Sequence, residues 1–266
     1  MERLGYQANT VSLLTFGDGI PELSWYYKEA AKRLASQALK SGWFHEIYVY
    51  DFEKLKLEVP EWCSLHQKFL FENRRGFGYW IWKFLIIYLA LKKIRYGDQL
   101  LYIDCGYELN VNGSKRFHEY TDAASIHSIL AFEIEQPILK WTKNDLFSYF
   151  DMESYPLLSS SKQIQAGLQL IKKTPLTLDF YRNLSELSTA EEYHLIDDSP
   201  STTPNHESFQ EHRHDQSLFT CLAKIYGIGF FPFYEDYWPE LWEKNLYRSD
   251  IPFQCLRNIS GTSKLP

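Results

Sequence analysis

The positions of apolar and polar residues along the chain predict strands and helices in alternation. The run Val11–Phe16 is rich in β-branched and aromatic residues and ends in a glycine-containing loop, which predicts a first buried strand. Apolar residues recur at helical spacing from about Ser24 to Leu39, and Glu46–Asp51 forms a second apolar strand. A strand, a helix and a strand in this order predict a βαβ unit with parallel strands and a right-handed crossover.

The pattern continues over the rest of the chain. A dense aromatic segment predicts a helix from about Tyr79 to Lys93, and the apolar strand Leu100–Ile103 follows it and ends at Asp104. The polar stretch from about 188 to 213 contains prolines and little periodicity, so we interpret it as a mobile loop or lid. The other expected elements are strands at Ile129–Ile134 and Gln163–Lys173, the latter with a glycine inside it, and helices at Thr142–Phe150 with Thr142 as cap, after Thr174-Pro175, and at Asp215–Ile225.

Together these elements predict a single α/β domain over residues 1–266, with a mostly parallel twisted sheet and helices on both faces. The chain is 45% hydrophobic and 17% aromatic, which is ample for one packed core. Its formal net charge of -6 argues against a protein whose main partner is a nucleic-acid backbone, because that function needs a large positive surface. The four cysteines lack the spacing of a zinc site or a disulfide framework.

Two further features predict a cytoplasmic protein without a membrane span. The amino terminus lacks the apolar core of a signal peptide, and scattered cysteines are consistent with a reducing compartment. The best apolar run is interrupted by Lys83 and is shorter than the roughly 20 residues that a spanning helix needs.

Lys83 and Asp104 are the first candidates for a functional site. Lys83 lies within the aromatic helix, where a buried cation must be paired or must face a polar ligand, because burying it alone costs several kcal/mol. Asp104 ends an apolar strand, at the carboxyl edge where α/β sheets hold ligands. If the strands are parallel, the loop Thr15–Asp18 and the cluster His212–Gln216 reach the same edge and form a crevice with Asp104.

Each candidate also has a purely structural interpretation. Asp104 could cap the turn after its strand, and Arg75, with its neighbour Arg74, could belong to a solvated loop instead of contacting phosphate. The tryptophans of the aromatic helix fit a core better than a ligand platform. The cluster around Asp215 could simply begin a helix, or hold a metal through its two histidines, or supply a carboxylate that orients an acceptor hydroxyl or takes its proton.

In their order and spacing these motifs resemble nucleotide-sugar glycosyltransferases with the GT-A fold. The segment Arg74–Phe84 is similar to an RGxGYWxWKP-type segment of bacterial and viral sugar transferases. A looser likeness connects the chain to the glycogenin and lipopolysaccharide galactosyltransferase family. Asp104 lies where that family has Asp-x-Asp, Gln165–Gly167 where it has Asn-Ala-Gly, and Asp215-Gln216 matches its Asp-Gln. The resemblance covers the chain from about Val11 to Phe231.

The resemblance implies transfer of a sugar from a nucleoside-diphosphate donor to a hydroxyl acceptor during polysaccharide, O-antigen or glycoprotein glycan assembly. It also implies roles for the matched residues, with Asp215 as the catalytic base or the group that orients the acceptor. The implied substrate-binding residues are Thr15, Phe16, Gly17 and Asp18 for base and ribose, Arg75 and Lys83 for the diphosphate or sugar, Asp104 and Gly106 for the sugar-phosphate end, Gln165, Ala166 and Gly167 for the sugar pocket, and His214 and Gln216 beside Asp215.

Two departures from the family pattern bear on a metal ion. The resemblance implies Mn²⁺ or Mg²⁺ bound by Asp104, where it would neutralise the diphosphate. Gly106, however, replaces the second Asp of Asp-x-Asp, and no histidine follows His214. Metal dependence therefore stays open at this point, with Asp104 as the first candidate ligand and Glu108 as the second.

Two other classes of protein stay as alternatives. A sugar nucleotidyltransferase would need a basic, glycine-rich loop near residue 20, and the chain has no Lys or Arg from Leu13 until Lys28. A non-catalytic glycan-binding protein would explain exposed aromatic residues such as Tyr234, Tyr237 and Trp238, and it would show no dependence on nucleotide.

Overall fold

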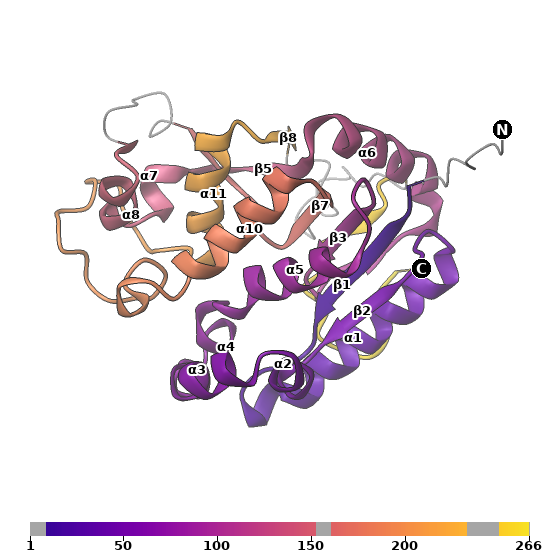
Figure 1. The fold of residues 1–266 in the computed structure, drawn as a ribbon, viewed down its shortest axis with the longest axis horizontal. Coiled ribbons are helices and arrows are strands. Elements are labelled where there is room, and N and C mark those ends of the chain that lie inside the picture. The colour runs from indigo at the N-terminus through magenta and orange to yellow at the C-terminus, as the bar shows by residue number, and fades with distance from the viewer. Residues whose placement is uncertain (1–8, 153–160, 233–249, 266) are drawn as a thin grey trace, which may run out of the picture.

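One sheet of seven strands forms the centre of the protein (Figure 1). The computed structural model describes residues 9–152, 161–232 and 250–265. Six strands are adjacent in the order β2-β1-β3-β7-β5-β6, and β8 pairs with β5. The strands are β1 Val11–Phe16, β2 Ile47–Tyr50, β3 Gln99–Ile103, β5 Ile129–Pro137, β6 Lys162–Ile164, β7 Leu168–Lys172 and β8 Gly229–Pro232, with a separate pair of β4 Glu108–Leu109 and β9 Phe253–Gln254.

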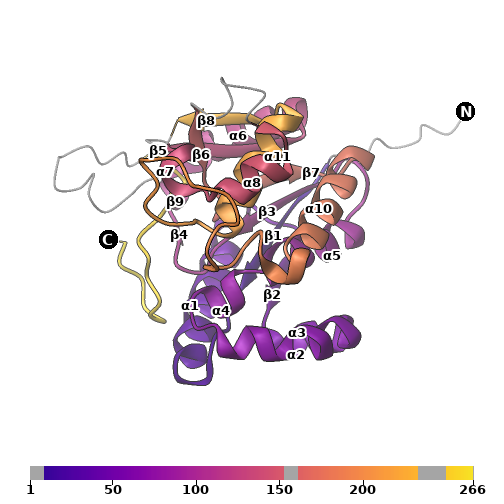
Figure 2. The same ribbon diagram turned by 90° about the vertical axis from the view of Figure 1, so that its left-hand side faces the viewer.

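Helices cover both faces of this sheet, as the turned view in Figure 2 shows. Within the described residues, none of them is both long and apolar enough to cross a bilayer. The helices are α1 Pro21–Ser41, α2 Phe52–Glu58, α3 Pro60–Glu72, α4 Gly76–Tyr79, α5 Trp82–Lys93, α6 Ser114–His127, α7 Ile138–Trp141, α8 Asn144–Tyr149, α10 Pro175–Leu187 and α11 Asp215–Tyr226, with 3-10 turns at Val111–Gly113 and Glu191–Tyr193.

Alternation along the strands builds a core on each face of the sheet. Leu14 and Leu100 pack in one buried cluster with residues of α5, α10 and α11. Leu13 and Leu101 pack in another cluster with residues of α1 and α6. Because successive side chains of a strand point to opposite faces, a strand covered on both sides has a continuous apolar run. This is why β1 and β3 could be located from the sequence, and the predicted α/β class is confirmed.

The sheet is mixed, whereas the sequence predicts a mostly parallel one. β1 runs parallel to β2 and β3, as the βαβ pattern predicts. β7 is antiparallel to both β3 and β5, and β6 is also antiparallel to β5. The predicted strand at 163–173 is therefore two short strands along β5, interrupted at Gln165–Gly167. The direction was missed because a buried strand shows the same apolar pattern whichever way it runs.

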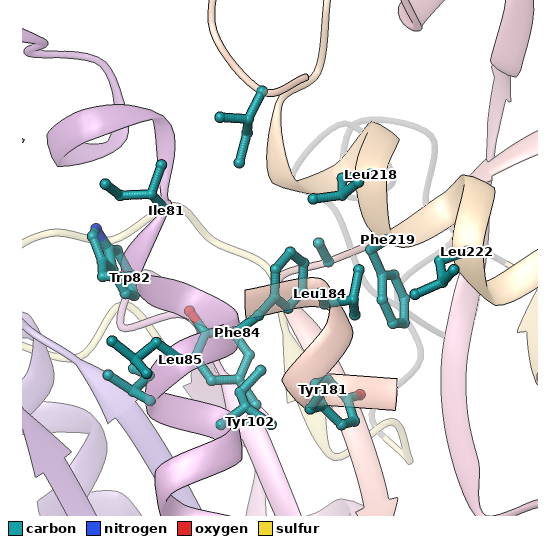
Figure 3. Packing of buried hydrophobic residues seen from close by; sticks show 14 of the residues in the cluster. Ile81, Trp82, Phe84, Leu85, Tyr102, Tyr181, Leu184, Leu218, Phe219 and Leu222 are labelled. Carbon is teal, nitrogen blue, oxygen red and sulfur yellow. The ribbon is translucent and has the colours of Figure 1, made fainter. Parts of the chain in front are cut away.

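Helices α5, α10 and α11 pack together through large apolar side chains (Figure 3). The ring of Phe84 in α5 lies 6.5 Å from that of Tyr181 in α10 and 6.2 Å from that of Phe219 in α11, measured between centroids. All three side chains are fully buried, and each such burial contributes about 1.5–3 kcal/mol. This packing fixes α5, which carries Lys83, relative to α11, which begins at Asp215.

The predicted helix starts are partly confirmed. Helix α10 begins after Thr174 with Pro175 in its first turn, as predicted, and the Thr174 hydroxyl caps it in a reciprocal capping box. The prediction that Thr142 caps α8 is wrong: the cap position is the next residue, and the Thr142 hydroxyl instead accepts a hydrogen bond of 2.8 Å from Gln163. Helix α5 begins at Trp82, later than expected, because the two residues from 79 to 80 have positive φ angles.

The stretch from 188 to 213, expected to be a loop, has no strand and only a 3-10 turn. Contacts in the middle of this stretch also attach it to the rest of the protein. Leu195 and Ile196 are buried in the core beside α11, and the His212 ring nitrogen lies 3.2 Å from the Leu195 carbonyl oxygen. Movement of this stretch as a lid stays a prediction.

Residues 250–265 at the end of the chain fold back onto α1 and the turn after β3. The Arg33 guanidinium of α1 donates hydrogen bonds of 2.8 Å to the carbonyl oxygens of Cys105 and Asn258. It also pairs with Glu108 of β4 at 3.2 Å, and both of these side chains are buried. The main-chain amide of Asn258 donates to the Gly106 carbonyl oxygen at 2.8 Å. This end of the chain is thereby held against the carboxyl edge of β3.

Candidate functional site

A cavity of about 470 Å³ lies at the carboxyl ends of β1 and β3. Its walls come from the loop after β1, from α4 and the start of α5, from the turn after β3, from the interruption between β6 and β7, from the start of α11 and from the C-terminal segment. The volume falls within the roughly 300–1,000 Å³ of small-molecule sites. The three segments that the sequence predicts at one sheet edge therefore do converge.

The Lys83 ammonium group contacts two carboxylates that line this cavity. Its Nζ atom lies 2.6 Å from Oδ2 of Asp215 and 3.3 Å from Oδ1 of Asp104. The Lys83 side chain is only 3% exposed. The rings of Trp80 and Tyr102 lie 5.8 and 5.4 Å from the same ammonium group, which adds a favourable cation–π contribution. The expectation that this lysine must be paired is confirmed.

The pKa values of the buried pair follow from burial and from each other's charge. Burial raises the pKa of Asp215 to about 6, against the opposing effect of the Lys83 ammonium. Burial lowers the pKa of Lys83, but the carboxylates of Asp104 and Asp215 outweigh it and raise that pKa above its ordinary value. At neutral pH the ammonium is therefore charged, and Asp215 is close enough to its pKa to exchange a proton.

Asp104 has one carboxylate oxygen engaged and remains accessible from the cavity. The Tyr102 hydroxyl donates a 2.6 Å hydrogen bond to its Oδ1, and its side chain is 38% exposed. Gly167 packs directly against it: a Cβ at position 167 would lie 2.7 Å from Asp104 Oδ2. Beside it, the buried Oε1 of Gln165 has no hydrogen-bond partner within the described parts of the chain. Gly106 and Ala166 also line the cavity, as predicted.

Of the predicted residues Thr15–Asp18, Phe16 at the end of β1 and Asp18 in the loop after it reach the cavity. The Phe16 ring stacks on Trp82 with 3.8 Å between centroids. Asp18 holds the loop in shape, because its oxygens accept hydrogen bonds from the Ser24 hydroxyl at 2.5 Å and from the main-chain amide of Phe52 at 3.1 Å.

Thr15 and Gly17 do not line the cavity, and their predicted contact with a substrate stays a prediction. Thr15 is fully buried and, as the neighbour of Phe16 in β1, points to the opposite face of the sheet. A Cβ at Gly17 would overlap the Ala31 side chain and lie 2.8 Å from the Tyr27 carbonyl oxygen. This glycine therefore allows α1 to approach β1 and serves packing.

Within the part of the chain that the structure describes, four arginines line the cavity, and two of them were not predicted. Arg75, with Arg74, precedes α4 as expected, and its guanidinium lies 3.3 Å from the Glu211 carboxylate. Arg213 lies 3.0 Å from the same carboxylate and stacks on the Trp141 ring at 4.2 Å. Arg257 comes from the C-terminal segment. Arg213 belongs to a polar cluster visible in the sequence, whereas nothing in the local pattern indicates Arg257.

The residues on either side of Asp215 also line the cavity. His214 has a φ of 52°, a strained value that turns the chain into α11 and aims Asp215 at Lys83. Burial lowers the pKa of His214 to about 4, so its ring is neutral at pH 7. The Gln216 amide donates a 3.2 Å hydrogen bond to Gln163 Oε1.

A divalent cation does not fit between Asp104 and Asp215. Mg²⁺ is commonly held by one or two carboxylates together with water and substrate phosphate, and no three His, Cys, Asp or Glu side chains of the described residues are grouped as a larger ligand set. Lys83 occupies the space between Asp104 and Asp215, where a cation would be repelled. Glu108, the second predicted ligand, is fully buried and pairs with Arg33 away from the cavity walls.

Comparison with known proteins finds likeness in structure and none in sequence. No protein-family model matches the chain, and no curated protein matches it in sequence. A glycosyltransferase involved in glycosylation of the major capsid of the virus PBCV-1 superimposes with a TM-score of 0.50 and 14% identity, over 92% of each chain. Mouse xyloside xylosyltransferase 1 gives 0.47 and 12%, over 92% of this chain and 97% of that one. The galactosyltransferase LgtC gives 0.46 and 13%, over 91% and 86%.

The likeness to the viral enzyme shows that the chain has the GT-A fold, as predicted. The aromatic residues Tyr234, Tyr237 and Trp238, on which the glycan-binding alternative drew, lie outside the described residues.

Proposed function

We propose that the protein is a glycosyltransferase that moves a sugar from a nucleoside-diphosphate donor to a hydroxyl group of a glycan or another acceptor. One observation carries this proposal: a cavity at the carboxyl edge of a GT-A sheet combines an excess of cationic side chains with carboxylates. The cations suit a diphosphate, and the carboxylates suit a sugar and a reacting hydroxyl. The charged side chains that line it are Arg74, Arg75, Lys83, Arg213 and Arg257, and Asp18, Asp104 and Asp215.

The donor is proposed to lie along the sheet edge. Base and ribose fit beside Phe16 and Asp18, and the diphosphate lies near the arginines. The sugar is proposed to lie between Asp104 and the interruption at Gln165–Gly167, where the Asp104 carboxylate is accessible and the buried Gln165 Oε1 atom has no hydrogen-bond partner within the described residues. These are the residues at which a sugar's hydroxyl groups find acceptors.

Asp215 is proposed as the base that receives the acceptor proton. Its carboxylate lines the cavity, and its pKa of about 6 lies close to neutral pH, where a general base is most effective. In the reaction the acceptor oxygen forms a bond to the anomeric carbon. The bond from that carbon to the diphosphate breaks, its electron pair stays on the diphosphate, and the hydroxyl proton passes to Asp215. The proposed setting is the assembly of polysaccharides, O-antigens or glycoprotein glycans.

The test is donor turnover by the full chain. A panel of uridine, guanosine and thymidine diphosphate sugars is incubated with alkyl glycosides, and both the released nucleoside diphosphate and the mass of the acceptor are measured. Asp104→Asn should lose turnover while its circular dichroism is unchanged. Asp179→Asn is the matched control, because Asp179 is an exposed residue of α10 that pairs with Arg182 and does not line the cavity.

The outcomes separate the classes of protein. Release of nucleoside diphosphate with a heavier acceptor supports the proposal. Formation of pyrophosphate from a nucleoside triphosphate and a sugar phosphate would show a nucleotidyltransferase instead. Glycan binding that no nucleotide alters would show a binding protein, and equal turnover by wild type and Asp104→Asn would place the site elsewhere.

A further inference from the structure

The carboxylates of the cavity are already engaged by groups of the protein itself. Asp104 and Asp215 share the Lys83 ammonium at 3.3 and 2.6 Å. Asp18 accepts hydrogen bonds from Ser24 and from the main chain of Phe52. A divalent cation at this edge would have to displace a buried ammonium group before it could gain two carboxylate ligands. The Lys83 ammonium group thus lies beside Asp104 in the place that a metal ion would fill.

Positive charge is gathered instead on three arginines from three separate segments. Arg75 and Arg213 lie at 3.3 and 3.0 Å from the carboxylate of Glu211, and Arg75 also lies 4.0 Å from Oδ2 of Asp198. Burial lowers the pKa of Arg213, Glu211 raises it, and the nearby charges of Arg75 and Arg257 lower it further. All three arginines line the same cavity, where an anion bound between them would reduce their mutual repulsion.

Among the described residues, five cationic side chains and three carboxylates line the cavity, so this lining carries excess positive charge. A nucleoside diphosphate needs that charge, because it is a polyanion and gains further negative charge when the sugar leaves. Guanidinium groups bind phosphate oxygens through paired, charge-assisted hydrogen bonds and keep their charge at any physiological pH.

We propose that fixed cations of the protein replace a divalent metal in this site, so that the donor is bound and its leaving group neutralised without Mn²⁺ or Mg²⁺. Arg75, Arg213 and Arg257 contact the diphosphate, and Lys83 is a positioning residue that holds Asp104 and Asp215 in place. This inference rests on the proposed function, since it names how that same site binds a nucleoside diphosphate.

The first experiment measures binding of uridine, guanosine and thymidine diphosphates to the full chain by calorimetry, in EDTA and then in millimolar Mn²⁺ or Mg²⁺. Dissociation constants that agree within about threefold in both conditions support the inference. A loss of more than about tenfold in EDTA overturns it and leaves the proposed function standing. Absence of binding by every nucleotide in every condition overturns both.

Arginine variants test which groups meet the phosphates. Arg75→Gln, Arg213→Gln and Arg257→Gln should each weaken diphosphate binding roughly tenfold, the effect of one charge-assisted contact, and leave binding of the nucleoside alone unchanged. Arg182→Gln is the matched control, because Arg182 is exposed on α10 and pairs within its own helix. Equal affinities for the diphosphate in all four variants would overturn the assignment.

A lysine variant tests the replacement directly. In Lys83→Ala the carboxylates of Asp104 and Asp215 lose their ammonium partner and become free to bind a metal. Turnover should then be low in EDTA and recover at least in part with Mn²⁺, whereas wild type should not respond. A folded Lys83→Ala protein whose activity is insensitive to Mn²⁺ would contradict the inference. If this variant does not fold, the EDTA comparison and the arginine variants still decide.

Discussion

Lys83→Met should destabilise the protein in a pH-dependent way. The substitution keeps an unbranched side chain of similar size within α5 but leaves the buried Asp215 carboxylate without its 2.6 Å partner. Removing one member of a buried ion pair typically costs about 3–5 kcal/mol. Asp104 is 38% exposed and can be solvated, so the lower end of that range, about 3 kcal/mol, is expected near pH 8.

The sign of the pH dependence follows from the pKa of Asp215. In wild type that pKa is about 6, above the ordinary value of 3.8, so the folded state binds the proton more tightly than the unfolded state. Stability from this group is present at low pH and is lost as the pH rises through 6. Without Lys83 the folded pKa rises further. The difference between variant and wild type should therefore grow above pH 6, by up to about 1.4 kcal/mol per pH unit, and nearly vanish at pH 5.

Urea unfolding, followed by tryptophan fluorescence at pH 5 and pH 8, measures this difference. Lys173→Met is the matched control, because the buried Lys173 ammonium donates to the carbonyl oxygens of Lys92 and Ile94, which do not titrate. Its cost should be similar at both pH values. A loss of stability by Lys83→Met that is the same at pH 5 and pH 8 would refute the electrostatic role assigned to Lys83.

Three further predictions concern the site and its support. Donor turnover should fall below about pH 6 as Asp215 takes up a proton. Asp215→Asn should lose most activity at every pH. An Asp215→Asn protein that keeps the wild-type dependence of turnover on pH would show that Asp215 is not the base. Gly167→Ala should lower donor turnover at least tenfold, because the new Cβ would lie 2.7 Å from Asp104 Oδ2. The free energy of unfolding should fall by about 1–3 kcal/mol. Full activity of this variant would show that Asp104 does not contact the donor. Arg33→Met should cost about 3 kcal/mol by removing the ion pair of the buried Glu108, which keeps hydrogen bonds from Asn258 and Lys264, and should make the C-terminal segment sensitive to brief proteolysis. Resistance equal to wild type would contradict the anchoring role.

The sequence led to much of the fold because its main signals are local. The apolar run of β1 and the start of α10 at Thr174-Pro175 depend on neighbours within a few residues, and both are confirmed. Strand direction was missed at β7, because the side-chain pattern of a buried strand is the same in either direction. The boundary of α5 was misplaced because the positive φ angles before Trp82 leave no mark on hydrophobic periodicity.

Part of the candidate site was also predicted from the sequence, and part of it was not. Lys83 was singled out because a charge in an apolar helix demands a partner, and the structure supplies Asp104 and Asp215. The segment Thr15–Asp18 was located correctly at the end of β1. The sequence could not show that Phe16 and Asp18 reach the cavity while Thr15 and Gly17 do not, because a one-residue shift along a strand reverses the direction of every side chain.

By itself, the sequence determined the positions of strands such as β1 and β3 and of helices such as α10 and α11, that Lys83 needs a partner, and that acid-bearing loops gather at one edge of the sheet. Only the tertiary structure decided that one ammonium group serves two carboxylates and that Arg257 joins Arg75 and Arg213 around the cavity. The reason is physical. Periodicity and capping act over a few residues, whereas the position of Arg257 depends on contacts such as that of Arg33 with Asn258, which are 225 residues apart along the chain.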